Sequence, residues 1–125
     1  LPIFDPKNIM RFVVKHRAEK RLYVFPTDQC PYVYAAAHTV DNFMHQPTRT
    51  MTGGASIACK LKFAVVYMAF REKEDFGYKM TFKEICEDAS QFTPEEIMNR
   101  FYRLLEEDIN DQPANYLWTH KRWKR

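Results

Sequence analysis

Asp28 and Gln29 are a carboxylate and an amide that stand just after a short apolar segment. The four residues 22–25 are apolar or aromatic and Pro26 ends the run, so we predict a buried strand over residues 22–25. The carboxyl ends of strands face the binding crevice in open α/β sheets. A carboxylate and an amide at that place can hold a substrate hydroxyl or orient the hydroxyls of a sugar. The alternative is an Asx-type turn in which Asp28 takes no part in chemistry.

A second polar stretch, residues 48–56, combines hydroxyl side chains with two glycines. Residues 57–62 behind it are typical of a short helix packed on a sheet. The free backbone N–H groups at the start of such a helix bind anions, and Arg49, Thr50 and Thr52 add a cation and two hydroxyls. The alternative is an ordinary threonine cap followed by small residues for close packing. Because neither Gly-x-x-x-x-Gly-Lys nor Gly-x-Gly-x-x-Gly occurs, we exclude a nucleotide-binding loop.

The carboxyl-terminal residues 112–125 place large rings between cations, in the pattern Pro-x-x-Tyr-x-Trp-x-His-Lys-Arg-Trp-Lys. A disordered tail is usually small and polar, whereas both tryptophans of the chain, Trp118 and Trp123, lie here. We therefore predict that at least one of them packs on the domain. Such packing would fix a basic patch that suits an anionic partner. The cations of this patch are Lys121, Arg122, Lys124 and Arg125. The alternative is a solvated charge cluster without a partner.

These three stretches, in this order, resemble motifs of the late lipid A acyltransferases, which belong to the lysophospholipid acyltransferase-like superfamily. The tail is similar to the closing motif of the family, Asp28-Gln29 to its motif after a strand, and the Thr-x-Thr-Gly-Gly run to its threonine-rich helix start. The resemblance implies an enzyme, without a cofactor, that moves a fatty acyl chain from acyl carrier protein to a hydroxyl of a lipid A precursor. It implies that the full-length protein works on the membrane surface, at the cytoplasmic face of the inner membrane.

The same resemblance implies roles for single residues. Substrate binding is implied for Asp28, Gln29, Arg49, Thr50 and Thr52. Contact with acyl carrier protein or with phosphate is implied for the four tail cations, Lys121, Arg122, Lys124 and Arg125.

The sequence departs from the family's pattern in its histidines. The family's chemistry uses a His-x-x-x-x-Asp/Glu motif, in which the histidine takes the proton from the acceptor hydroxyl and the carboxylate orients the histidine. Five positions after the four histidines stand Arg21, Phe43, Thr50 and Arg125, none of them acidic. The motif precedes this region in the family. We therefore expect residues 1–125 to be a single domain, the carboxyl-terminal part of an acyltransferase domain, without the general base and without a catalytic residue of its own.

Residues 30–47 have no clear period and are expected to form a long, functional loop. Their last part is similar to a Phe-Phe-Gly-x-Pro-Ala-like turn of the family but lacks the glycine, and Pro31-Tyr32 replaces another family glycine. Both departures change the shape expected for this loop, on which the acyl or acceptor selectivity depends.

The other elements predict an α/β fold with a small, mostly parallel sheet and a β-hairpin, covered by helices. Asp5-Pro6 is typical of a helix start. Residues 63–70 are apolar throughout, which favours a central, parallel strand beside residues 22–25. Residues 78–85 mostly alternate apolar with polar and are expected to pair with them as a hairpin. A capping box at residues 93–96 begins a helix whose apolar stripe is Ile97, Phe101, Leu104, Leu105 and Ile109.

Composition narrows the classes of function. A net charge of +3 is too small to argue for a nucleic-acid partner, and no apolar run is long enough to span a bilayer. The three cysteines have no Cys-x-x-Cys spacing and are expected to be free thiols. His38 and Asp41 lack a third ligand, so we expect no metal site. The alternatives are an acyltransferase of the same superfamily acting on another lipid, and a non-enzymatic basic module that binds membrane or nucleic acid through its tail.

Overall fold

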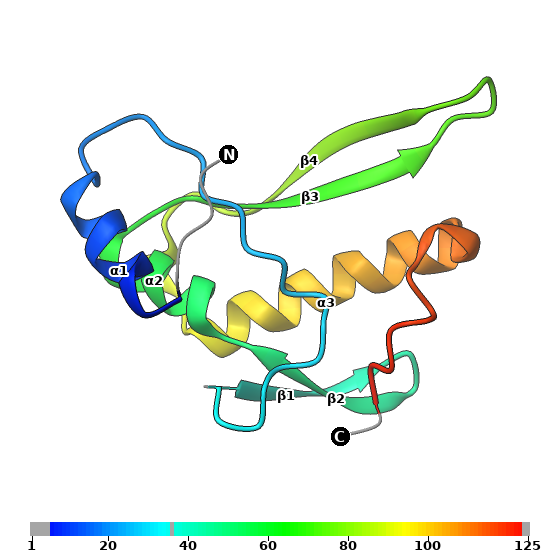
Figure 1. The fold of residues 1–125 in the computed structure, drawn as a ribbon, viewed down its shortest axis with the longest axis horizontal. Helices are drawn as coiled ribbons and strands as arrows, with labels where there is room; N and C mark the ends of the chain where they lie inside the picture. Colours follow the sequence, from blue (N-terminus) through cyan, green and yellow to red (C-terminus); the bar gives the residue numbers. More distant parts are fainter. Residues whose placement is uncertain (1–5, 36, 124–125) are drawn as a thin grey trace.

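The computed structural model describes residues 6–35 and 37–123 (Figure 1). The longest helix, α3, runs between two β-hairpins and contacts both (Figure 1). The elements in chain order are α1 (Pro6–Lys15), β1 (Ala37–Phe43), β2 (Gln46–Met51), α2 (Gly53–Leu61), β3 (Val65–Glu72), β4 (Tyr78–Cys86), the short 3-10 helix η1 (Ala89–Gln91), α3 (Pro94–Asp111) and the 3-10 helix η2 (Pro113–Asn115).

Both sheets in the described part of the chain are two-stranded and antiparallel. β1 pairs with β2, and β3 pairs with β4 from Val65 opposite Cys86 to Glu72 opposite Tyr78. The predicted hairpin between β3 and β4 is confirmed, and the mixture of helices and strands agrees with the predicted α/β class. The prediction of a mostly parallel sheet is wrong.

The apolar run at residues 63–70 explains this error. A run that is apolar at every position favours a strand covered on both faces. In β3, Tyr67 and Ala69 are indeed buried, but Val66 and Phe70 on the other face are exposed. The apolar pattern is therefore that of a hairpin strand with one covered face, and β3 is not a central strand.

Residues 22–25, predicted as a strand, belong to no sheet. They run past β3 and α3 without strand pairing (Figure 1). The ring of Tyr23 stacks on Phe63 with centroids 6.0 Å apart, and Phe25 packs against Gly54. These side-chain contacts hold the segment in place of backbone pairing.

The first hairpin lies where a loop was predicted. β1 buries only Val40 and Phe43, so its alternation in the sequence is weak. Its turn uses Met44 and His45 in the left-handed region, with φ of 52° and 64°, as a two-residue hairpin turn of type I′ requires. The backbone N–H of Met44 donates to Glu106 on α3 at 2.9 Å, which supports the turn without a glycine.

The helices follow their sequence signals. α1 begins at Pro6 as predicted, although its predicted cap, Asp5, lies outside the described residues. Thr93 accepts from the backbone of Glu96 at 3.2 Å and donates its own backbone N–H to the Glu96 carboxylate at 2.8 Å, so the predicted capping box is present. The predicted short helix is α2, but it begins earlier than predicted, at Gly53, so that both glycines lie in its first turn. None of the helices in the described part of the chain has the length and hydropathy to cross a bilayer.

Candidate functional site

Three stretches that lie far apart in the sequence meet around the side chain of Tyr102. Tyr102 is on α3 and is 1% exposed. Its hydroxyl donates to the carbonyl of Thr27 at 2.9 Å, directly before Asp28. Arg122, from the tail, donates to the same hydroxyl at 2.6 Å. The hydroxyl of Thr50, from β2, is buried close to it. The predicted site segments around residues 28, 50 and 122 are therefore neighbours in the fold.

Burial keeps the hydroxyl of Tyr102 protonated. Burial is the main cause that raises the pKa of Tyr102, and the nearby carboxylate of Asp28 raises it further. The hydroxyl of Thr50 and the guanidinium of Arg122 lower the pKa, but by less. The net pKa lies above the ordinary value for tyrosine. Because the phenol is uncharged at neutral pH, it remains the donor to the Thr27 carbonyl.

The tail also holds the backbone after Asp28. The N–H of Cys30 donates to Nε2 of His120 at 3.0 Å. Nε2 is therefore the acceptor nitrogen, and the proton of the neutral imidazole lies on Nδ1. Asp28 is half-buried between these two attachments, and Gln29 is exposed.

The threonines of β2 face inward. Thr48 accepts from the indole N–H of Trp123 at 2.8 Å, and Thr50 and Thr52 are buried. Thr52 stands at the start of α2 but its side chain makes no capping hydrogen bond. Residues 48–51, predicted as part of a helix start, belong instead to β2. Of the predicted binding residues in this stretch only Arg49 has an exposed side chain, so ligand contact through Thr50 and Thr52 stays a prediction.

The cations of the tail do not all lie at the surface. Arg122 is 3% exposed, and its guanidinium donates to Tyr102 and to the carbonyl of Arg49. It is therefore not part of the exposed basic patch that we predicted, because the tail backbone turns its side chain inward. Lys121 is exposed, and its contact with a partner stays a prediction. The predicted cations Lys124 and Arg125 lie outside the described residues.

The predicted packing of a tail tryptophan is confirmed. Trp123 packs against the core, with its ring centroid 6.2 Å from that of Phe43. Trp118 is 49% exposed, and its indole N–H donates within the tail to the carbonyl of Pro113.

A cleft of about 880 Å³ is lined by residues of β3 and α3 and by Asp28. Residues 21–28 also line it, and the charged residues of its lining include Arg21, Asp28, Arg71 and Asp108. Its lining is mostly apolar and includes Leu22, Val24, Phe63, Met68, Phe82 and Leu117.

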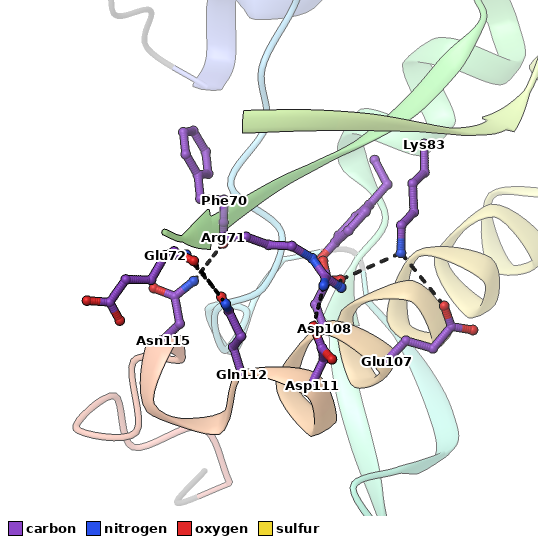
Figure 2. Close-up of polar contacts among 10 residues, drawn as sticks. Phe70, Arg71, Glu72, Lys83, Glu107, Asp108, Asp111, Gln112 and Asn115 are labelled. Atoms are coloured by element: carbon purple, nitrogen blue, oxygen red, sulfur yellow. Dashed lines mark hydrogen bonds and ion pairs between the residues drawn. The ribbon is translucent and has the colours of Figure 1, made fainter. Parts of the chain in front are cut away.

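A second polar cluster joins the β3–β4 hairpin to α3 (Figure 2). Asp108 accepts from the hydroxyl of Tyr67 at 2.8 Å and from Arg71 on β3 at 2.6 Å, while Lys83 reaches it from β4 at 3.6 Å. Burial alone would raise the pKa of Asp108, but the hydrogen bonds from Arg71 and Tyr67 outweigh it and hold the pKa below its ordinary value. Arg71 also pairs with Asp111. Each of these carboxylates has a cation, so we interpret the cluster as a structural connection.

Side-chain amides extend this connection along the free edge of β3 (Figure 2). Gln112 accepts from the N–H of Glu72 at 3.0 Å and donates to its carbonyl at 3.1 Å, as a neighbouring strand would. Asn115 donates to the carbonyl of Phe70 at 2.6 Å. The residues that directly follow α3 thus cover the edge of β3 that faces away from β4.

Sequence reasoning missed Tyr102, around which the site is built. The predicted apolar stripe does not include Tyr102, yet Tyr102 lies three residues before Leu105 and four after Met98, on the buried face of α3. Because a buried tyrosine normally has a hydrogen-bond partner, its position on this face was a usable signal. Within residues 6–35 and 37–123 no group of three or more His, Cys, Asp or Glu side chains is placed to hold a metal ion.

Comparison with known proteins finds one family over almost the whole chain. The model of the bacterial lipid A biosynthesis acyltransferases matches residues 2–125. No curated protein matches the chain.

Proposed function

Because the chain belongs to the bacterial lipid A biosynthesis acyltransferase family, we propose that the full-length protein transfers a fatty acyl chain from acyl carrier protein to a hydroxyl of a lipid A precursor. Residues 1–125 are then the carboxyl-terminal part of its acyltransferase domain, and the enzyme works at the cytoplasmic face of the inner membrane. The observation that carries this proposal is the position of Asp28, which lines a mostly apolar cleft of about 880 Å³.

Asp28 is suited to orient the acceptor. In the transfer, the acceptor oxygen bonds to the acyl carbon, the thioester C–S bond breaks, and the hydroxyl proton passes through a general base to the leaving thiolate. We assign that base to the His-x-x-x-x-Asp/Glu motif of the family, outside residues 1–125. A carboxylate near the acceptor does not need to take the proton itself, because accepting a hydrogen bond from a substrate hydroxyl already fixes the attacking oxygen. Gln29 is exposed beside it and offers an amide to a second hydroxyl.

Lys121 is the tail cation suited to meet an anionic partner. Its side chain is exposed, next to a buried neighbour that fixes the backbone. Acyl carrier protein is acidic and lipid A precursors carry phosphates, and an exposed lysine attracts either by long-range electrostatics.

The test is an acyl-transfer assay on the full-length protein, with the product followed by mass spectrometry. We expect the lipid A precursor to gain one ester-linked acyl chain when acyl carrier protein is the donor. Lys121→Glu should raise the apparent KM, and added salt should raise the wild-type KM but leave that of the variant nearly unchanged. Transfer from acyl-coenzyme A but not from acyl carrier protein would contradict the proposed donor. A precursor that gains no acyl chain from either donor would contradict the proposed acceptor.

A further inference from the structure

The protein backbone is held on both sides of residues 28–29. On one side, the hydroxyl of Tyr102 donates to the carbonyl of Thr27 at 2.9 Å. On the other side, the N–H of Cys30 donates to His120 at 3.0 Å. The exposed fraction of Tyr102 is only 1%, so water has little access to the hydroxyl that donates the first of these bonds. The position of the Asp28 carboxylate therefore depends on these two hydrogen bonds.

Arg122 acts on the first of them through Tyr102. Arg122 is 3% exposed, and its guanidinium donates to the Tyr102 hydroxyl at 2.6 Å and to the carbonyl of Arg49. Its Nε is buried without a hydrogen-bond partner, and no carboxylate of the described residues forms an ion pair with it. A buried cation without a counter-ion is costly. An arginine at this place therefore favours a role beyond stability.

We propose that Arg122 is a positioning residue for Asp28; this rests on the proposed function, in which Asp28 contacts the acceptor. A hydroxyl that accepts from a cation becomes a stronger donor, because hydrogen bonds in a chain polarise one another. The charge of Arg122 thus strengthens the bond from Tyr102 to Thr27, and that carbonyl belongs to the peptide that leads into Asp28. Loss of the guanidinium releases this peptide and misplaces the carboxylate, while the acyl donor binds as before.

The three cysteines allow a local opening of the segment around Asp28 to be distinguished from a general destabilisation of the domain. Cys30 lies in the held segment, whereas Cys59 is on α2 and Cys86 is on β4, and all three are free thiols. We would measure the alkylation rate of each cysteine by iodoacetamide in the full-length protein, resolving the peptides by mass spectrometry. The variants are Arg122→Gln and Tyr102→Phe. The matched control is Arg103→Gln, because Arg103 is the exposed neighbour of Tyr102 on α3.

Both variants should raise the alkylation rate of Cys30 by roughly tenfold, the size expected for loss of one charge-assisted hydrogen bond that closes a segment. Cys59 and Cys86 should keep their wild-type rates. The two changes combined should have little more effect than either alone, because they break one chain of hydrogen bonds. Arg122→Lys, which can still donate to the Tyr102 hydroxyl, should lie between the wild type and Arg122→Gln.

The same preparations are assayed for acyl transfer. Arg122→Gln should lower kcat by roughly tenfold with little change in the KM for acyl donor, as for an interaction realised in the transition state. An unchanged rate at Cys30, or a rise at all three cysteines together, would overturn the positioning role. If the alkylation rate of Cys30 rises but kcat is unchanged, both the positioning role of Arg122 and the role of Asp28 are wrong. A wild-type protein that transfers no acyl chain would contradict only the proposed substrates, and the rates at the cysteines would still decide whether Arg122 holds the segment.

Discussion

The guanidinium of Arg122 lies 2.6 Å from the hydroxyl of Tyr102, which joins the tail to the middle of α3. Both side chains are almost completely buried. Tyr102 in turn donates to Thr27, so one hydroxyl connects the tail, the long helix and the segment that leads into Asp28. Aromatic rings also pack around Tyr102: the rings of Phe43 and Tyr102 meet edge to face, with their centroids 4.8 Å apart. Both the shape of the site and part of the stability of the domain therefore depend on Tyr102.

Tyr102→Phe should destabilise the protein by about 1–3 kcal/mol, because it leaves the buried guanidinium of Arg122 and the partly buried carbonyl of Thr27 without the hydroxyl that connects them. The measurement is urea-induced unfolding of the full-length protein. Tyr116→Phe is the matched control, since the hydroxyl of Tyr116 makes no hydrogen bond with the described part of the chain and its ring is half-buried. Equal effects of the two substitutions would show that the Tyr102 hydroxyl contributes nothing particular.

The two glycines at the start of α2 should respond in opposite ways to alanine. A Cβ on Gly54 would lie 2.9 Å from Cγ of Phe25, whereas a Cβ on Gly53 would meet no atom within 4 Å. Gly54→Ala should therefore cost about 1–3 kcal/mol, as overpacking does, and shift the segment before Asp28. Gly53→Ala should be neutral or stabilise the protein by about 0.5–1 kcal/mol. Thermal unfolding compares them, and equal melting temperatures would contradict the contact with Phe25.

Asp108 should stabilise the folded protein at neutral pH, and this stabilisation should be lost in acid. Because hydrogen bonds from Arg71 and Tyr67 outweigh burial and lower its pKa in the folded state, the stabilisation is complete above its unfolded pKa and is lost as the pH falls through the lower folded value. Asp108→Asn should thus cost about 1–3 kcal/mol at neutral pH, and this difference should shrink below about pH 4. Urea unfolding between pH 7 and pH 3 measures it. Asp75→Asn, at the exposed hairpin tip, is the control; a pH-independent difference for Asp108→Asn would refute this account.

Local signals in the sequence predicted the helices and one hairpin. The capping box at Thr93 and the apolar stripe after it are short-range features, and they mark α3 correctly. The alternation in residues 78–85 likewise marks β4. Sheet topology depends on contacts between distant residues, so an apolar run such as residues 63–70 does not distinguish a parallel strand from one side of a hairpin. The first hairpin was missed because its turn has Met44 and His45 where glycine or asparagine would be the usual signal.

The candidate site was partly visible in the sequence for a similar reason. Asp28 and the tail carry distinctive residue types, and the fold brings both to Tyr102. The burial of Arg122 could not be predicted from its neighbours in the sequence. Four cations among polar and aromatic residues are typical of an exposed segment. Only the register of the tail against β2 and α3 turns Arg122 inward and leaves Lys121 outside.

The central claim is that Asp28 orients the acceptor in acyl transfer, and the most direct test is kcat/KM of the full-length enzyme with Asp28→Asn. Asp41→Asn is the matched control, because Asp41 is exposed on β1. Loss of one charged hydrogen bond in the transition state predicts a decrease of roughly tenfold to a hundredfold for Asp28→Asn. Its urea unfolding should match that of the wild type, and Asp41→Asn should keep full activity. If Asp28→Asn transfers acyl chains at the wild-type rate, or loses activity only because it unfolds, Asp28 is a structural turn residue and the claim is wrong.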